Sequence, residues 1–166
     1  MQLFDEMLDA WRYTRDGVIA EVENLPENVF SAPPHGLERT VLDLVNHIVE
    51  SSRLMAGELS RADGDFLRKE YPELVAEYFR EGDVAQTKAE AVELLRRCFA
   101  EDEKQIRTAG QDAMMKPIRQ FNGEKASRMA WFHHGISHEE YHRGQLAIYA
   151  RLNGETPALT KLIMGS

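Results

Sequence analysis

Residues 131–152 read WFHHGISHEEYHRGQLAIYARL and contain four of the six histidines in the chain. No proline interrupts this stretch, and proline is the residue that most strongly breaks a helix interior. Ser127 precedes it as a good N-cap, and Asn153-Gly154 follows it as a normal C-terminal stop. We therefore predict a long helix from Ser127 to Asn153-Gly154.

Three of these histidines share one face of the predicted helix. At about 100° per residue, His134, His138 and His142 fall within about 80° of one another on a helical wheel. The same side carries Trp131, Tyr141, Gln145, Tyr149 and Leu152, and the other side carries Glu139, Glu140, Arg143 and Arg151. The pattern predicts that the histidines lie in the middle of the core-facing stripe, where buried imidazoles need polar partners.

Two inward-facing histidines one turn apart can converge on one metal ion. His138 and His142 have this spacing, and His47 is a candidate third ligand. His47 lies in LDLVNHIVESS, at the edge of the apolar face of another predicted helix. Three neutral imidazoles leave one or more coordination positions open to water or substrate, as in a reactive metal site.

The rest of the chain has the periodicity of further long helices. Apolar residues spaced three, four and seven apart indicate helices over residues 2–24, about 40–60 and about 87–109. Thr40 and Thr87, each with an acidic residue three positions later, have the pattern of N-terminal capping boxes. Long amphipathic helices of this kind are typical of a four-helix bundle.

Shorter elements are expected between the long helices. A short helix is expected from Phe66 to Phe79, interrupted or started near Pro72. Residues 110–126 contain turn residues, and MKPIRQF within them alternates as a short extended segment does. We therefore predict one all-α domain over 1–166, a four-helix bundle with an additional short helix between its second and third long helices.

The composition argues against several classes of protein. The net charge is −8, which repels phosphate backbones and argues against nucleic-acid binding. No run approaches the roughly 18 apolar residues that a membrane span requires. Cys98 is the single cysteine, so we expect no internal disulfide and interpret it as a small core residue rather than a nucleophile. We expect a cytoplasmic protein that binds neither membranes nor nucleic acids.

His47 together with HEEYHRGQL at 138–146 resembles the DinB/YfiT-like superfamily of four-helix-bundle proteins. The specific part of the resemblance is short and consists of His47, His138, His142, Arg143, Gly144 and Gln145. The resemblance implies that the three histidines bind a divalent ion, commonly zinc or nickel, while iron and cobalt also suit imidazole ligands. It also implies a homodimer and an S-transferase or isomerase activity that uses a low-molecular-weight thiol.

The residues around the triad have several interpretations. His134 is interpreted as a base behind the ligands or as a core residue, with a fourth metal ligand as the alternative. Gln145 either orients a ligand, lines the pocket or bonds to another helix, and Tyr141 lies on the same side. No side chain is a convincing general base, so no catalytic residue beyond the ligands is assigned.

Three rival interpretations compete with this one. HEEYH matches the H-E-x-x-H signature of zinc metalloproteases with Glu139 as base, but the extended signature fails at Gln145 and Ile148. A di-iron bundle needs a second E-x-x-H motif, and Leu44 stands where its glutamate would be. The third rival is a non-catalytic, dimeric metal-binding or stress-related protein with a structural ion, which normally has four protein ligands.

The sequence therefore favours a metal-dependent enzyme with a small-molecule substrate. The ion would lower the pKa of a bound thiol or water near neutral pH. A thiol that attacks an electrophilic substrate gives S-transfer, and water in its place gives hydrolysis.

Overall fold

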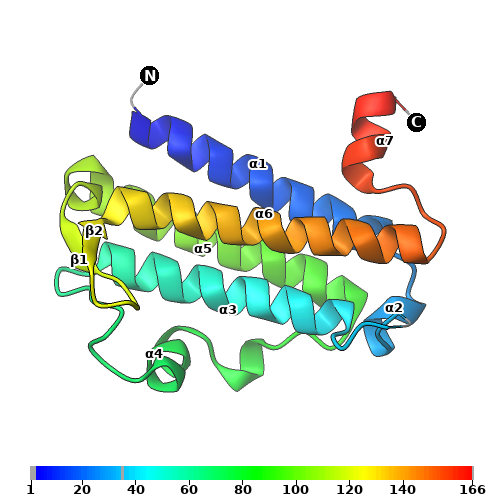
Figure 1. Ribbon diagram of the computed structural model, residues 1–166, viewed down its shortest axis with the longest axis horizontal. Helices are drawn as coiled ribbons and strands as arrows, with labels where there is room; N and C mark the ends of the chain where they lie inside the picture. The colour runs from blue at the N-terminus through cyan, green and yellow to red at the C-terminus, as the bar shows by residue number, and fades with distance from the viewer. Residues whose placement is uncertain (1–2, 35, 166) are drawn as a thin grey trace.

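The computed structural model describes residues 3–34 and 36–165, without the side chain of Glu81. Four long helices lie side by side along the long axis of the molecule (Figure 1). They are α1 (Leu3–Asn24), α3 (Val41–Ser60), α5 (Lys88–Met114) and α6 (Arg128–Leu152). Helix α1 packs against α5 and α6, and α3 packs against the same two helices. This is the predicted all-α four-helix bundle; residue 2 of the first predicted helix lies outside the described residues.

The connections carry the shorter elements, which are α2 (Asn28–Ser31), α4 (Tyr71–Tyr78), the 3-10 turn η1 (Glu81–Asp83), β1 (Pro117–Arg119), β2 (Lys125–Ser127) and α7 (Ala158–Met164). Helix α4 begins at Tyr71, which agrees with the predicted start near Pro72 and not with the one at Phe66, because proline fits the first turn of a helix. The two strands pair antiparallel; β1 lies in MKPIRQF, the segment predicted to be extended, and β2 lies beyond it. The sequence does not predict α2 or α7, whose four and seven residues are too few to show a helical period.

Side-chain caps fix where two of the long helices begin. At α3 the capping box is complete, because Thr40 Oγ1 accepts from Asp43 N at 3.1 Å and Asp43 Oδ2 accepts from Thr40 N at 2.7 Å. At α5 only half of it forms, because Thr87 Oγ1 accepts from Glu90 N while the Glu90 carboxylate accepts from another backbone amide. The sequence therefore locates both helix starts correctly, and the box with aspartate is the complete one.

Helix α5 runs beyond its predicted end at residue 109. Gly110 has a φ of 79° and a non-helical ψ, and the chain resumes helical turns to Met114 after this kink. A positive φ is open to glycine at little cost, so Gly110 bends α5 instead of ending it. None of the helices within the described ranges has both the length and the apolar character needed to span a bilayer.

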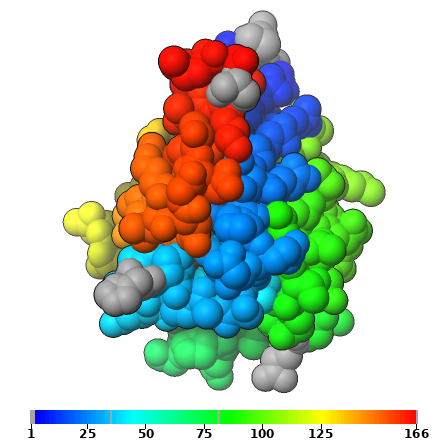
Figure 2. Space-filling model, turned by 90° about the vertical axis from the view of Figure 1, so that its right-hand side faces the viewer, coloured from blue at the N-terminus to red at the C-terminus, as the bar shows by residue number. Residues whose placement is uncertain are grey.

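Helix α7 lies outside the bundle, beside α1, and its red atoms lie next to the blue atoms of α1 in the upper part of the end-on view (Figures 1 and 2). The buried carboxylate of Glu21 on α1 accepts the backbone N–H groups of Ala158 and Leu159 at 2.9 and 3.2 Å. These N–H groups at a helix start have no partner within the helix. Glu21 therefore fixes the position of α7 from a different part of the chain.

A buried carboxylate, Asp102, occupies the core-facing side of α5, among the apolar residues that the sequence predicts there. Asp102 accepts from Ser52 Oγ and from Arg53 Nη1, both at 2.9 Å. Burial raises the pKa of Asp102 to about 6, although Arg53 and Ser52 act in the opposite direction. The unfolded chain has an aspartate pKa of about 3.9. Protonation of Asp102 therefore stabilises the folded state. This contribution to the free energy of unfolding is complete below about pH 4 and is lost as the pH rises through about 6.

This dependence of stability on pH can be tested with an Asp102→Asn variant, whose side chain keeps an oxygen for Ser52 but does not titrate. We predict that the unfolding free energy of the wild type, relative to this variant, falls by about 2–3 kcal/mol between about pH 4 and pH 7. Denaturant unfolding of both proteins at the two pH values measures the difference. A difference that stays constant with pH would contradict the prediction.

Candidate metal centre

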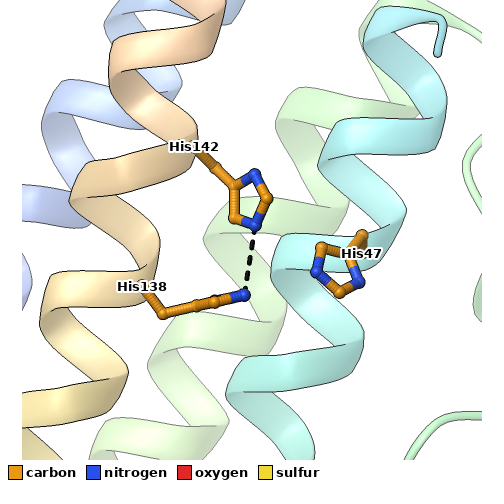
Figure 3. A group of neighbouring side chains, drawn as sticks. All are labelled: His47, His138 and His142. Atoms are coloured by element: carbon orange, nitrogen blue, oxygen red, sulfur yellow. Dashed lines mark hydrogen bonds between the residues drawn. The ribbon is translucent and has the colours of Figure 1, made fainter. Parts of the chain in front are cut away.

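Three histidine side chains from two helices meet between α3 and α6 (Figure 3). His138 and His142 lie one turn apart on α6, and their Nε2 atoms are 3.1 Å apart. The His47 ring on α3 is centred 5.2 Å from that of His138 and 4.9 Å from that of His142. One nitrogen from each ring lies within 4.8 Å of the others. The structure thus brings together all three residues that the sequence proposes as ligands.

The donor set fits a divalent ion of the zinc or nickel type. Two nitrogens bound to one tetrahedral zinc ion, each at about 2.0–2.1 Å, lie about 3.3 Å apart, which is close to the observed separation of 3.1 Å. Burial, and to a smaller extent the neighbouring His142, lower the pKa of His47 and of His138 to about 4. The pKa of His142 is also lowered, again chiefly by burial. Neutral imidazole, the form that binds metal, is therefore the form present near neutral pH.

Gln145 orients His142. Its Oε1 atom lies 2.7 Å from His142 Nδ1, and an amide oxygen can only accept a hydrogen bond. His142 therefore carries its proton on Nδ1 and directs the Nε2 lone pair toward His138 and His47. Such contacts fix the tautomer of metal-binding histidines in proteins, so Gln145 is placed to orient the candidate ligand His142, which is one of the roles that the sequence suggests.

The predicted core face of α6 is wrong. The residues of α6 that are buried include Glu139 and Arg143, at 2% and 7% exposure, whereas Tyr141 and Leu152 are 65% and 55% exposed. His138 and His142 lie at the edge of the buried face, next to α3, instead of in its middle. The helical wheel places charged side chains in water by default, and it cannot show that a partner on another helix neutralises one of them.

That partner is Arg15 on α1. Arg15 donates from Nη2 and Nε to the two carboxylate oxygens of Glu139, at 2.7 and 2.9 Å. Trp11 Nε1 donates to the same carboxylate at 2.8 Å, and Arg15 Nη1 donates to Leu95 O at 3.1 Å. Both members of the ion pair are almost fully buried, at 0% and 2% exposure of their side chains. The pair ties α6 to α1 and α5.

The same contacts remove Glu139 from the chemistry of a metalloprotease. The H-E-x-x-H mechanism needs the glutamate to act as a base beside the metal. Glu139 instead turns toward α1, with both carboxylate oxygens held by Arg15. The structure therefore gives no support to the protease interpretation.

Arg143, next to His142 in the sequence, is also buried, and it fits against α1 because Gly17 lacks a side chain. A Cβ atom on Gly17 would lie 2.3 Å from the guanidinium carbon of Arg143. Arg143 Nη1 donates to Glu140 Oε1 at 3.2 Å, and its guanidinium lies over the Tyr13 ring at 5.5 Å. Arg143 therefore connects α6 to α1, a role that the sequence does not reveal.

The other predicted pocket residues take different places. His134 is exposed and stacks on the Trp131 ring at 4.6 Å, so the core-residue interpretation is wrong. It lines a cavity beside the triad and does not belong to the group of three close donors. Tyr141 lies against His142 with ring centroids 5.1 Å apart, and it is largely exposed and outside the cavity lining.

Comparison with known proteins agrees with the fold. The model of the DinB superfamily matches residues 10–146. The DinB-like protein YjoA from Bacillus subtilis is 19% identical, with a TM-score of 0.67 over 91% of this chain and 93% of that chain. YfiT from Bacillus subtilis, called a probable metal-dependent hydrolase with an unusual four-helix bundle topology, is 12% identical, with a TM-score of 0.71 over 94% of this chain and 91% of that chain.

A third structure belongs to a mutant of the mycothiol-dependent maleylpyruvate isomerase. It is 13% identical, with a TM-score of 0.68, and the match covers 87% of this chain but 61% of that chain. These identities show a shared fold alone, and no curated protein matches this chain by sequence. Because the family model covers most of the chain and the fold agrees with it, the chain belongs to the DinB superfamily.

Proposed function

We propose that this protein is a divalent-metal enzyme of the thiol S-transferase or hydrolase type. His47, His138 and His142 would hold the ion, with zinc or nickel as the first choice and iron or cobalt as the next. The observation that carries the proposal is the convergence of three imidazoles from two helices at the edge of a cavity.

The number of ligands favours a reactive centre over a structural one. Structural zinc sites normally have four protein ligands, whereas catalytic sites have three and an open position. Within residues 3–34 and 36–165, no fourth histidine, cysteine, aspartate or glutamate joins the three histidines. A bound ion would lower the pKa of a thiol or water that occupies the open position.

The described residues beside the triad orient the proposed ligands, and none of them is placed to act as a general base. Gln145 holds the proton of His142 on Nδ1, and both carboxylate oxygens of Glu139 are held by Arg15 of α1. The descriptions of YfiT as a probable metal-dependent hydrolase and of the isomerase as mycothiol-dependent support both forms of the proposal.

The test begins with metal analysis of the purified protein, for which we expect one equivalent of metal per chain. Glutathione, bacillithiol, mycothiol and water are then compared as nucleophiles toward an electrophilic reporter such as 1-chloro-2,4-dinitrobenzene, before and after treatment with a chelator. We expect at least one nucleophile to react at least about tenfold faster with the metal-loaded protein, as metal-assisted nucleophiles do. His138→Ala should lose this acceleration, and the exposed His133→Ala should keep it. Stoichiometric metal without any acceleration would favour the non-catalytic alternative.

A homodimer is part of the proposal, because the family resemblance implies one. Helix α7 leaves Leu162, Ile163 and Met164 between 72% and 74% exposed, which provides apolar surface beside α1. Light scattering of the purified protein should return about twice the 19.0 kDa of one chain. A monomeric mass across the micromolar range would remove this part of the proposal.

A further inference from the structure

A cavity of about 150 Å³ opens beside the triad, and His47 and His138 are among the residues that line it. Four aromatic side chains line it from four different segments of the chain: Phe66, Tyr71, Phe121 and Trp131. Phe66 lies in the loop after α3, Tyr71 begins α4, Phe121 lies in the turn between β1 and β2, and Trp131 lies in the first turn of α6. The β1–β2 hairpin and α4 therefore contribute side chains to the same cavity.

The aromatic rings form one continuous wall. The Phe66 ring is centred 5.0 Å from Phe121 and 4.9 Å from Trp131, and Phe121 is 5.7 Å from Trp131. Tyr71 extends the wall, with its ring 5.8 Å from Phe121. These are the separations at which aromatic pairs attract one another. The backbone N–H of Phe66 donates to Arg119 O on β1 at 3.1 Å, so the loop and the hairpin hold the wall together.

The cavity contains no cationic side chain. Among the described residues, neither lysine nor arginine lines it, and Glu139 is the one acidic residue in its lining. Glu139 is already neutralised by Arg15. A carboxylate or phosphate group placed against the aromatic wall would lose its hydration without gaining an opposite charge, which is costly.

The size of the cavity sets a further limit on what it can hold. An apolar cavity of about 150 Å³ in another protein holds one benzene molecule. The geometry points to a substrate that carries one uncharged, ring-sized apolar group, seated against Phe66, Phe121 and Trp131, with its reactive part toward His47 and His138. The orientation of the reactive part rests on the proposed function, whereas the preference of the cavity for an uncharged ring does not.

The test compares benzamide, which is uncharged, with benzoate, an anion of almost the same shape. Titration calorimetry is performed on the full chain, metal-loaded and after chelator treatment. In the metal-free protein we expect benzamide to bind at least about tenfold more tightly than benzoate, because nothing there offsets the charge of the anion. Equal binding of the two, or no binding of benzamide, would overturn the inference.

Two variants locate the binding site. Phe121 is 42% exposed in its turn, so Phe121→Ala removes part of the wall with little disturbance of the bundle core, and it should weaken benzamide binding about fivefold to tenfold. Tyr13→Ala is the matched control, because Tyr13 is 58% exposed on α1 and does not line this cavity, and it should change binding less than about twofold. An unchanged affinity in Phe121→Ala would overturn the assignment of the ring to this wall.

Metal content separates this inference from the proposed function. Protein that binds benzamide with the expected preference but retains no metal would support the cavity inference and contradict the metal-enzyme proposal. Protein that retains one metal ion, but that after chelator treatment binds benzamide and benzoate equally, would support the metal site and contradict the cavity inference.

Discussion

Replacement of His142 by alanine is expected to abolish stoichiometric metal binding while the chain stays helical. His142 is the proposed ligand that Gln145 orients, and its Nε2 atom lies 3.1 Å from that of His138. Removal of a residue that supports a ligand typically costs metal sites about 10- to 100-fold in affinity, so removal of one of three ligands should cost at least about 100-fold. Metal content after dialysis and far-UV circular dichroism measure the two parts of the prediction.

Two further variants show whether the loss is specific. His133→Ala should keep full metal content, because His133 is an exposed histidine on the same helix and outside the triad. Gln145→Leu should be intermediate, since it removes the acceptor for His142 Nδ1 but leaves three imidazoles in place. Full metal content in His142→Ala would show that the ligand assignment is wrong.

Replacement of Arg15 by alanine should lower the free energy of unfolding more than the replacement of any residue on the surface of the protein. It would leave the Glu139 carboxylate buried at 2% exposure with Trp11 Nε1 as its remaining side-chain donor. Breaking a buried ion pair by removing one partner costs about 3–5 kcal/mol. Denaturant unfolding of the variant and the wild type at neutral pH measures this loss.

The control is the surface pair of Arg12 with Glu103. Arg12 is on the same helix but half-exposed, so Arg12→Ala should cost less than about 1 kcal/mol. The double variant Arg15→Met with Glu139→Leu should recover much of the stability, because apolar groups of similar size replace the pair without leaving a buried charge. If Arg15→Ala cost no more than Arg12→Ala, the pair would not hold the helices together.

The double variant also tests the chemistry. Glu139 lies between two proposed ligands in the sequence, and as a catalytic base it would be essential. The geometry instead gives it a structural role, so the folded double variant should still bind one metal ion through His47, His138 and His142. Loss of metal binding from a stable, folded double variant would contradict that separation of roles.

The long helices and the pair of His138 with His142 could be predicted because their signals are local. The 3.6-residue period, Thr40 and Ser127 at helix starts, and Asn153-Gly154 at a helix end all act within a few residues. The convergence of His47 with HEEYHRGQL came from the family resemblance and the bundle topology, not from spacing along the chain, because a single helical wheel does not say which helix lies opposite.

The features that the sequence does not predict depend on contacts between distant segments of the chain. The buried face of α6 depends on Arg15, which is 124 residues away from Glu139 in the sequence, and on the missing side chain of Gly17, which makes room for Arg143. Helix α7 depends in the same way on the carboxylate of Glu21. Contacts between distant segments override the local preference in each case, and periodicity carries no information about them.

The most direct test of the metal centre is anomalous diffraction, at the absorption edge of the metal found by elemental analysis, from crystals of the metal-loaded protein. The account predicts one anomalous peak at about 2.0–2.3 Å from one ring nitrogen of each of His47, His138 and His142, with at least one position occupied by water or a small ligand. A peak elsewhere in the chain, or an ion enclosed by four protein ligands, would contradict it.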